Sequence, residues 1–597
     1  MKDRRSVLFS LGLTTVAALI ACPEAAPEHT DAGGADAASA DAASADALQV
    51  DAAAIDASSA DTAGFDAALP GAIYVDAQIA SGECTDYDST SRSCGSGTAR
   101  AFDTLAGAAA VAAPGDTVLI RGGSYGEVLQ PQRSGQAGAP ISYRGYPGES
   151  AVITGATLAP GVELSGRSHL VIEGLEVRGV RRWLYALDTH DCVIRGNTFA
   201  QALDSGGSSK TGLFFQEATR NRLLDNLIDD STQDNLSLIK SDRNLVQGNT
   251  LRRAAHTLWT IKCGNHNVLR GNDFHNEHQK IGEIYDCDGV GFDHQFDLVD
   301  ATRRNLVEDN VFSYTASSGD ASPYAGIQYA GQEGIIRRNR FHDTVGPGLS
   351  MTLYGGEAEH NTDNRVYHNT FARTDFAGIE LSGSQSYSFG GNVFKNNVLA
   401  RSRFVANDTR WSWYTGELDG QPVQLLTGRL DGFLFDTNCF FDTQADQLYL
   451  ITHGSRTESS NPAPETVTWW QSNHPSLFTG SLEVEPGFVD EALRDLRLDT
   501  GSALRDAGTF LTTASGDGSG TTLAVADARY FYDGFGIPDE VGDLIQLDGD
   551  TQTARVVAVD IAASTLTLDA ALSWSAGQGV ALAYSGERPD VGAYESR

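Results

Sequence analysis

The chain has little basic charge and no long apolar run beyond its N-terminus. After the first residues no stretch of about 20 apolar residues occurs, so we expect nothing else to cross a membrane. Lys and Arg number 43 against 78 Asp and Glu, and the formal net charge is −35 at pH 7. A protein that binds nucleic acid through a general basic surface needs the opposite balance, so we expect no nucleic-acid partner. Helical periodicity is also lacking, and 64 glycines favour a turn-rich β architecture.

The N-terminal segment 1–22 has the pattern of an export signal. Lys2, Arg4 and Arg5 precede the apolar stretch 7–21, which ends at Cys22. The letters LIAC at its end resemble the lipobox of bacterial lipoproteins. This resemblance implies lipid attachment at Cys22 and a place in the cell envelope, at the outer membrane or the cell surface. A cleaved signal peptide with an incidental cysteine is the alternative.

A low-complexity acidic segment follows over residues 23–70. Aspartates recur every five residues from Asp31 to Asp66, in an Ala- and Ser-rich background without Lys or Arg. Such a segment has too little apolar surface to offset its ordering entropy, and evenly spaced like charges extend it. We therefore predict a disordered tether between the lipid anchor and a folded body that begins at residue 71.

A short pattern then returns eight times, each time as an apolar residue, an Asn three residues later and a second apolar residue after two more. The eight residues are Asn197, Asn226, Asn249, Asn272, Asn310, Asn339, Asn369 and Asn392. Repeats at intervals of about 22 to 30 residues indicate a solenoid, because each unit buries its apolar face only by stacking on its neighbours. We predict an all-β protein, a right-handed parallel β-helix over residues 71–510, in which these Asn side chains form an internal ladder.

The predicted solenoid needs a cover at each end. Residues 98–113 predict an amphipathic helix that covers the first coil. Residues 511–584 alternate apolar and polar in short runs, which predicts a small inserted β domain. This insert would interrupt a C-terminal cap made from residues 502–508 and completed by residues 585–597. We expect the whole molecule to be a monomer.

The chain has seven cysteines, and export would place them in an oxidising compartment. Cys84 and Cys94 enclose a short polar loop and are predicted to form a disulfide. Cys263 and Cys287 are separated by about one coil, so they are predicted neighbours in a side-chain stack. For this pair we favour two free thiols over a disulfide.

One part of the body is locally basic. Residues 178–280 contain 14 Lys and Arg against 11 Asp and Glu, which suggests an anionic ligand. Lys240 and Lys262 each end an apolar run, and their separation of about one coil predicts that they project from adjacent coils onto one face. The next coil is longer, because Asn272 and Asn310 stand farther apart than the other repeats, and its extra loop would form a cleft wall beside the lysines.

Two short segments resemble polysaccharide lyase family six, which holds alginate lyases and chondroitinase B. That family has Lys-Ser at the end of one strand and Arg-His-Gly-Asn at the end of the next. Here Lys240-Ser241 matches the first, and the run from Lys262 to Asn265 stands in place of the second. The resemblance implies β-elimination in a uronic-acid-containing anionic polysaccharide of the alginate or chondroitin/dermatan type. Lys240 would be the base, and Lys262 would stabilise charge or protonate the leaving oxygen.

Further site residues follow from their nearness to these lysines. The predicted substrate-binding residues are Arg243, His256, Trp259, His278 and Glu283. A tryptophan at such a place can stack on a sugar ring or pack between coils, and both alternatives stay open. Family members that bind Ca²⁺ use acidic residues just before the lysine, where this chain has Gln233 and Asn235. A Ca²⁺ ion held weakly by these two residues is the cofactor that the resemblance suggests.

Two other functions fit the same sequence. A pectin-type glycoside hydrolase needs paired aspartates, for which Asp286 and Asp288 are the candidates. A non-catalytic surface protein that binds polysaccharide or acts as an adhesin fits the anchor and the tether. Only an elimination leaves an unsaturated uronate in the product, so product absorbance separates the lyase from both alternatives.

Overall fold

The computed structural model describes residues 71–80, 82–204, 211–287, 301–315, 324–352, 360–374, 377–382, 388–401, 421–425, 432–441, 449–450 and 465–596. The β-helix and the insert described here belong to one compact unit, residues 66–597. The predicted signal, the lipidation candidate Cys22 and the tether lie outside the described residues. Within the described ranges, no helix has the length and apolarity that a membrane span requires.

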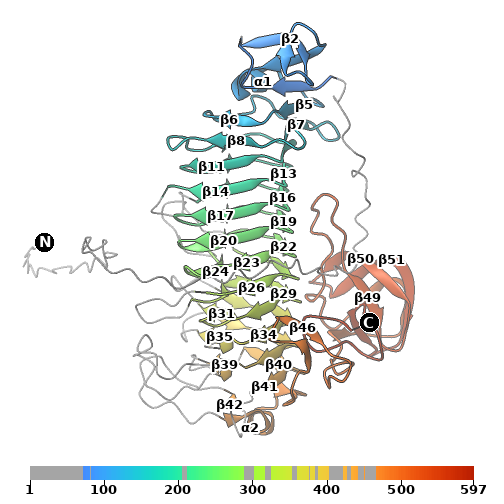
Figure 1. Ribbon diagram of the computed structural model, residues 1–597. Coiled ribbons are helices and arrows are strands. Elements are labelled where there is room, and N and C mark those ends of the chain that lie inside the picture. The colour runs from blue at the N-terminus through green and yellow to red at the C-terminus, as the bar shows by residue number, and fades with distance from the viewer. Residues whose placement is uncertain are drawn as a thin grey trace, which may run out of the picture. The chain divides into compact units, whose positions relative to one another are not determined.

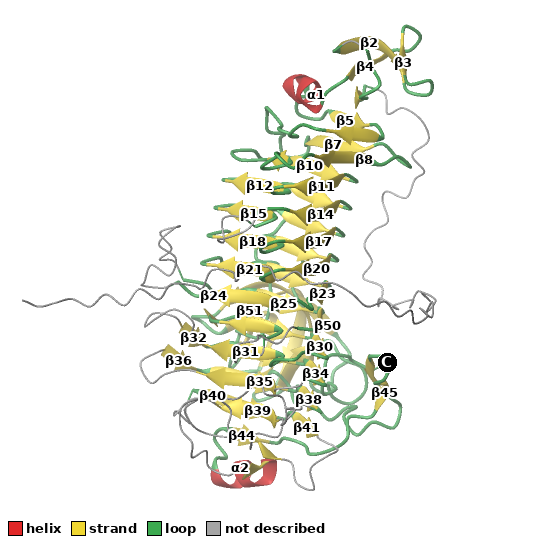
Figure 2. Ribbon diagram, turned by 60° about the vertical axis from the view of Figure 1, so that its left-hand side comes forward, coloured by secondary structure: helices red, strands yellow, loops and turns green. Residues whose placement is uncertain are grey.

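Three parallel sheets wind around a common core as a right-handed β-helix, which confirms the predicted fold class (Figure 1). Most coils contribute one strand to each sheet, and strands of successive coils pair in parallel, as Figure 2 shows for the stacked rows.

Sheet A contains β5 (Thr117–Ile120), β7 (Ile141–Gly145), β10 (Leu170–Glu173), β13 (Val193–Arg195), β16 (Arg222–Leu224), β19 (Leu245–Gln247), β22 (Val268–Arg270), β25 (Leu306–Glu308), β29 (Ile335–Arg337), β33 (Arg365–Tyr367), β37 (Asn392–Lys395), β40 (Phe433–Asp436) and β44 (Phe478–Thr479). Sheet B contains β6 (Gly123–Tyr125), β8 (Ala151–Thr154), β11 (Glu176–Val180), β14 (Thr198–Ala202), β17 (Leu227–Ser231), β20 (Thr250–Ala254), β23 (Asp273–His275), β26 (Val311–Ser313), β30 (Arg340–His342), β34 (Thr370–Ala372), β38 (Val398–Ala400) and β41 (Cys439–Phe441).

Sheet C contains β9 (Val162–Glu163), β12 (Leu184–Leu187), β15 (Leu213–Gln216), β18 (Leu236–Ile239), β21 (Thr257–Lys262), β24 (Lys280–Tyr285), β27 (Ile327–Tyr329), β31 (Leu349–Thr352), β35 (Ala377–Ser382) and β39 (Gln421–Leu425). A short fourth ladder is formed by β28 (Gly331–Gln332), β32 (His360–Thr362) and β36 (Ser388–Gly390).

The predicted Asn ladder runs through the interior. Asn226 Oδ1 accepts from the backbone N–H and the side-chain amide of Asn197, both at 3.0 Å, and Asn249 Oδ1 does the same for Asn226 at 2.9 Å. Each Asn side chain therefore supplies a hydrogen-bond partner to a buried backbone group of the coil before it, which water cannot reach. The ladder consists of Asn197, Asn226, Asn249, Asn272, Asn310, Asn339, Asn369, Asn397 and Asn438.

The assignment of Asn392 to this ladder is wrong. Asn397 occupies the position beside Asn369, and Asn392 instead bonds the backbone N–H of Asn364, at 3.2 Å. Asn364 and Asn392 belong to a second ladder, which the sequence reading missed and whose other members are Asn221, Asn244, Asn267 and Asn305. The signal was present, because a second Asn stands five residues before most of the first-ladder residues.

One position of the second ladder is filled by a tyrosine from another strand. Gly334 occupies the place between Asn305 and Asn364, and a Cβ there would meet the Tyr329 hydroxyl. That hydroxyl donates to Asn364 Oδ1 at 2.8 Å, which replaces the amide that Gly334 cannot supply. The ladder thus continues without a buried unsatisfied acceptor at this point.

The N-terminal end combines strands with a short helix. It contains β1 (Ile73–Val75), β2 (Glu83–Asp88), β3 (Ser93–Cys94), β4 (Ala99–Phe102) and α1 (Leu105–Val111). The predicted helix over 98–113 is therefore too long, because its first residues form β4, which pairs with β1. Leu105 and Ala108 of α1 are buried in the main core. The predicted disulfide between Cys84 and Cys94 is confirmed.

The predicted insert is a six-stranded antiparallel sheet. Its strands are β47 (Thr512–Thr513), β48 (Gly518–Ala524), β49 (Leu544–Leu547), β50 (Thr553–Asp560), β51 (Thr565–Trp574) and β52 (Gly579–Leu582). Its apolar core continues onto the outer face of sheet A, where Leu245, Val268 and Leu306 pack against it. The insert is thus an integral part of the second unit rather than a module on a linker.

The two predicted pieces of the C-terminal cap precede and follow the insert in the sequence, and they contact each other in the structure. Val591 N donates to Leu504 O at 3.0 Å, and Gly508 N donates to Pro589 O at 2.8 Å. Gly592 N then donates to Asn396 O at 2.8 Å, which attaches the cap to the stacked coils. The other elements of this region are β42 (Tyr449–Leu450), β43 (Glu465–Thr466), α2 (Val467–Asn473), β45 (Phe488–Asp490) and β46 (Asp495–Leu498).

Candidate active site on the outer face of sheet C

The two predicted catalytic lysines are not equivalent positions of adjacent coils. The coil length here is 23 residues, as the separation of Asn244 and Asn267 shows, so the spacing of the two lysines falls one residue short. Lys262 pairs with Ile239, and Lys240 N donates to Lys262 O at 2.9 Å. Lys240 lies at the end of β18 with φ 46°, the same left-handed conformation that Cys263 adopts at the equivalent place, φ 53°.

From Trp259 onward, side chains of β21 alternate between the core and the outer face of sheet C. Trp259 and Ile261 belong to the main core, whereas Thr260 and Lys262 point away from it. The strand register then places Glu283 beside Thr260, and Tyr285 beside Lys262. A row of polar positions therefore crosses successive coils on this face.

An aspartate and a histidine form a close pair at the start of this row. Asp234 Oδ1 accepts from His256 Nδ1 at 2.7 Å, and Ser237 Oγ donates to Asp234 Oδ2 at 3.4 Å. The other ring nitrogen of His256, Nε2, lies 3.7 Å from Glu283 Oε1. His256 thus stands between two carboxylates that come from neighbouring coils.

A lysine completes the cluster. Lys280 Nζ forms an ion pair with Glu283 Oε1 and donates to Gln328 Oε1 at 3.3 Å. Burial lowers the pKa of Lys280 to about 8; the nearby Asp234 carboxylate opposes this shift, and the positive charge of Lys262 adds to it. Lys262 Nζ lies 5.6 Å from the centre of the Tyr285 ring, within reach of a cation–π contact.

Exposure differs sharply within the cluster. Asp234 and Glu283 are only 2% and 1% exposed, and Lys262 and Lys280 keep 9% and 8%. The His256 side chain is 37% exposed, so it is the member most accessible to a large ligand. The two acids and the two lysines are therefore buried, and the imidazole is the one well-exposed side chain of these five.

The structure brings three of the predicted site residues together and adds two. His256 and Glu283 lie in one cluster with Asp234 and Lys280, and Lys262 is close enough for its charge to act on Lys280. The separation of Asn244 and Asn267 already gives a coil length of 23 residues in the sequence. This length predicts that Glu283 lies beside Thr260, with Lys280 just before it on the same strand. The predicted functions of these residues stay predictions.

Two predicted substrate-binding residues have structural roles instead. Trp259 is 1% exposed and packs in the core, where its ring lies over Gly282 of the next coil, so it does not stack on a sugar. Arg243 Nε donates to Phe535 O of the insert at 3.0 Å, which draws this side chain to the domain interface. His278 is exposed on the turn between β23 and β24, where its backbone N–H donates to Asn276 Oδ1 at 3.4 Å.

The predicted calcium ligands do not fit a cation site. Asn235 is fully buried inside the coil, and its amide donates to Ile228 O at 3.2 Å and Arg252 O at 2.8 Å. Gln233 is half-buried before it, and the acidic residue between them, Asp234, bonds His256. Across the described part of the chain, acidic, His and Cys side chains gather at metal-binding spacing only at Cys84, Asp86 and Cys94, where both cysteines are already in a disulfide.

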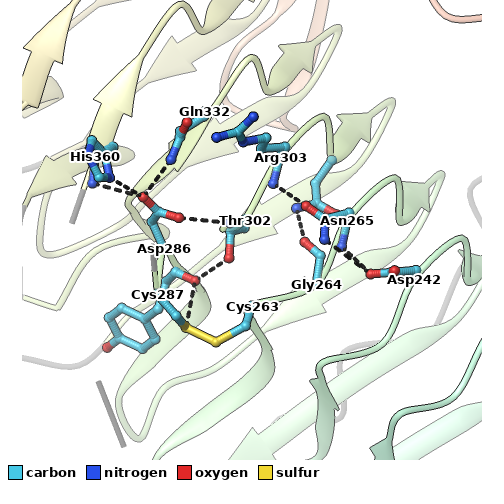
Figure 3. Close-up of a disulfide and its surroundings, with 12 residues drawn as sticks. Asp242, Cys263, Gly264, Asn265, Asp286, Cys287, Thr302, Arg303, Gln332 and His360 are labelled. Atoms are coloured by element: carbon cyan, nitrogen blue, oxygen red, sulfur yellow. Dashed lines mark hydrogen bonds and ion pairs between the residues drawn. A yellow bond between two sulfur atoms is a disulfide. The ribbon is translucent and has the colours of Figure 1, made fainter. Parts of the chain in front are cut away.

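A disulfide joins the two coils directly beside the cluster. Cys263 follows Lys262 and is bonded to Cys287, with 5.4 Å between their Cα atoms, so the expectation of two free thiols is wrong (Figure 3). Both cysteines lie outside the main core in an apolar cluster with Phe214 and Ile239. Their stacked positions on neighbouring coils meet the geometry that a disulfide needs.

Asp286, next to this disulfide, is a buried carboxylate that accepts several hydrogen bonds. Its Oδ1 accepts from Thr302 N at 2.7 Å, and its Oδ2 accepts from Gln332 Nε2 at 2.9 Å and His360 Nδ1 at 2.7 Å (Figure 3). A carboxylate so fully engaged and buried is poorly placed as a hydrolytic acid or nucleophile. Its predicted partner, Asp288, and most of the extra loop of this coil lie outside the described residues.

Fold and site together define the chain as a right-handed parallel β-helix protein with a candidate active site on sheet C. A family model described as "Right handed beta helix region" matches residues 160–296. The uncharacterized protein YwoF of Bacillus subtilis (strain 168) is 25% identical over 451 residues, which cover 68% of this chain and 88% of that protein.

Solved structures with a similar fold include two polysaccharide lyases. Pectate lyase Pel9A is 13% identical with a TM-score of 0.40, over 88% of this chain and 96% of that one. A mannuronic-acid-specific family 6 polysaccharide lyase from human gut microbiota is 16% identical with a TM-score of 0.37, over 63% and 87% of the two chains. The likeness is one of fold, and it carries no substrate over to this chain.

Proposed function

We propose that this chain is a polysaccharide lyase that cleaves a uronic-acid-containing polymer by β-elimination on the outer face of sheet C. The observation that carries the proposal is the pair Lys262 and Lys280, which come from neighbouring strands and are close enough for the charge of Lys262 to act on the pKa of Lys280. Lys280 also pairs with the buried Glu283, which lies 3.7 Å from His256. A polymer of the alginate or chondroitin/dermatan type would supply the anionic partner of these lysines.

The chemistry of elimination explains why such a pair is useful. The proton at C5 of a uronate becomes acidic enough to remove only when the neighbouring carboxylate is neutralised. Lys262 and Lys280 would neutralise that carboxylate with fixed positive charge. Because no cation site fits at Gln233 and Asn235, the proposed mechanism uses no step through calcium.

The base and the acid complete the reaction. The family resemblance makes Lys240 the base, and its backbone N–H donates to Lys262 O. An ammonium group of the pair would protonate the leaving oxygen at C4.

We further propose that the protein is exported and lipid-anchored through Cys22. Two disulfides in the folded body support this proposal, because such bonds persist in oxidising compartments. Cys22→Ser should move the protein from the membrane fraction to the soluble fraction on cell fractionation. Unchanged membrane association would contradict the anchor.

The test of the lyase is the absorbance of the conjugated product near about 235 nm, which only an elimination creates. The full chain would be assayed on alginate, chondroitin sulfate, dermatan sulfate and pectate, beside Lys262→Ala. Arg178→Ala is the matched control, because this exposed basic side chain lies on sheet B. We expect a rise that Lys262→Ala reduces at least about 100-fold and the control leaves unchanged.

Other outcomes name other functions. New reducing ends without a rise in absorbance would show a hydrolase. Tight binding of a polymer without any new chain end would show a binding protein or adhesin, and both results would overturn the proposed lyase.

A further inference from the structure

Resting on the proposed function, we infer that His256 is the base that removes the C5 proton, and that Asp234 is its positioning residue. Neither the sequence pattern nor the family resemblance assigns these roles. The inference depends on how the two side chains are held and on which of their neighbours reach the surface.

The contact with Asp234 determines which ring nitrogen of His256 is available. A carboxylate can only accept, so the 2.7 Å contact puts the hydrogen of the neutral ring on Nδ1 and leaves a lone pair on Nε2. Asp234 is itself held by Ser237 Oγ, whose hydroxyl lies 2.8 Å from Thr211 Oγ1. An imidazole oriented by a buried carboxylate is the arrangement that general bases use in other enzymes.

Glu283 would stabilise the product of the proton transfer. Its Oε1 lies 3.7 Å from Nε2, close enough to favour the imidazolium once that nitrogen has taken the proton. Glu283 also forms an ion pair with Lys280. The same carboxylate therefore contacts both the proposed base, His256, and a lysine that would neutralise the substrate. The charged groups in contact with His256 are thus Asp234 and Glu283, and Lys280 pairs with Glu283.

The elimination then balances within this cluster. The C5–H bond breaks, the proton moves to Nε2 of His256, and the electron pair forms the C4–C5 double bond. The C4–O bond breaks, and the leaving oxygen keeps its electron pair and takes a proton from the Lys262 ammonium. Exchange with solvent returns His256 and Lys262 to their starting states, so the net change is one chain cleavage.

His256 is better placed for this step than either lysine candidate. Lys280 is committed to Glu283 and Gln328, and its side chain is only 10% exposed against 37% for His256. Lys240 aligns with Cys263 instead of with the outward row of Thr260 and Glu283. The accessible group with a lone pair is therefore the imidazole.

The experiment compares pH–rate profiles of the full chain carrying His256→Gln, Asp234→Asn, Lys280→Met or Lys240→Ala. His275→Gln is the matched control, since this imidazole is 33% exposed, lies 2.6 Å from Glu277 and belongs to sheet B. We expect His256→Gln to lower kcat at least about 100-fold with intact polymer binding and an unchanged unfolding midpoint. Asp234→Asn should shift the acid limb of the profile, which a merely structural role would not do.

Several results would overturn the inference while leaving the lyase intact. An active wild type whose activity survives His256→Gln and disappears in Lys240→Ala would make Lys240 the base. An acid limb near pH 8 that is absent from Lys280→Met would assign the role to Lys280. If the wild type cleaves no polymer, the proposed function itself fails.

A second measurement does not depend on activity. ¹⁵N chemical shifts of His256 in the full chain should show hydrogen on Nδ1 at high pH, and Asp234→Asn should abolish this preference. Hydrogen on Nε2 in the wild type would contradict the arrangement directly.

Discussion

At the scale of single residues, one buried arginine joins the coils to the insert. Arg337 is 1% exposed, and its guanidinium lies 2.6 Å from both Glu308 Oε2 of sheet A and Asp543 Oδ1 of the insert. It also donates to the Tyr367 hydroxyl at 3.0 Å. Every charge in this group has a partner, which is the condition under which burial of ions is tolerated.

Removal of this arginine should therefore leave the buried Asp543 carboxylate without its guanidinium partner, while Glu308 keeps its ion pairs with Arg270 and Arg338. We expect Arg337→Met to destabilise the protein by about 3–5 kcal/mol, measured by denaturant or thermal unfolding. Arg253→Ala is the matched control, because it removes a bidentate pair with Asp229 in which the arginine is half exposed, and should cost less than about 1 kcal/mol. Equal effects of the two substitutions would show that the buried network contributes little.

Asp343 gives a residue-scale prediction on pH. Burial alone would raise the pKa of this carboxyl, but hydrogen bonds from His342 and Arg494 outweigh it and lower the pKa to about 2. A depressed pKa contributes stability above the ordinary value of 3.8, and the contribution is lost as the pH falls towards 2.

Asp343→Asn should therefore lower the unfolding midpoint clearly at pH 4.5 and much less at pH 2.5. The difference between the two pH values corresponds to about 1.5 kcal/mol. The measurement is thermal unfolding of wild type and variant across this range, and a penalty that does not change with pH would contradict the assigned cause.

At the scale of elements, large and small residues alternate between stacked strands. The Trp259 ring on β21 extends over Gly282 on β24, and Trp183, just before β12, extends over Gly212, just before β15. A Cβ at Gly282 would stand 2.1 Å from the Trp259 ring, so glycine is required by the close approach. The same strand β24 carries Lys280 and Glu283 of the candidate site.

We expect Gly282→Ala to cost about 1–3 kcal/mol and to reduce lyase activity, because the clash displaces β24. Gly390→Ala is the control, since a Cβ at this strand glycine meets nothing within 4 Å. Stability is measured by thermal unfolding and activity by product absorbance. A variant with wild-type stability would mean that the core can repack around the added methyl group.

At the scale of the whole molecule, the insert covers apolar surface of sheet A. Leu245, Val268, Leu306 and Ile335 of four successive coils pack into the core that the insert shares with the β-helix. Such a row of side chains would form a large exposed apolar patch without the insert. The insert therefore covers an apolar face of sheet A that would otherwise be exposed to water.

Deletion of residues 511–584 should accordingly lower the unfolding midpoint and cause concentration-dependent association, measured by light scattering. The candidate site lies on sheet C, so residual activity of the remaining monomer should persist. A deletion variant that stays monomeric and equally stable would show that the interface contributes little.

The sequence by itself determined the architecture, because burial repeats with each coil. An apolar residue, an Asn and a second apolar residue at each turn can be satisfied only by stacking, and the ladder from Asn197 to Asn369 follows from that pattern. The disulfide of Cys84 and Cys94 was equally predictable, because its loop is local.

Only the tertiary structure decided which side chains stand next to one another across coils. Coil length varies, with 23 residues between Asn249 and Asn272 but 38 between Asn272 and Asn310, and one residue of difference changes every lateral neighbour. That is why Lys262 lies beside Ile239 rather than Lys240. The site around His256 and Lys280 arises from stacked coils, and its neighbours depend on a register that local pattern does not contain.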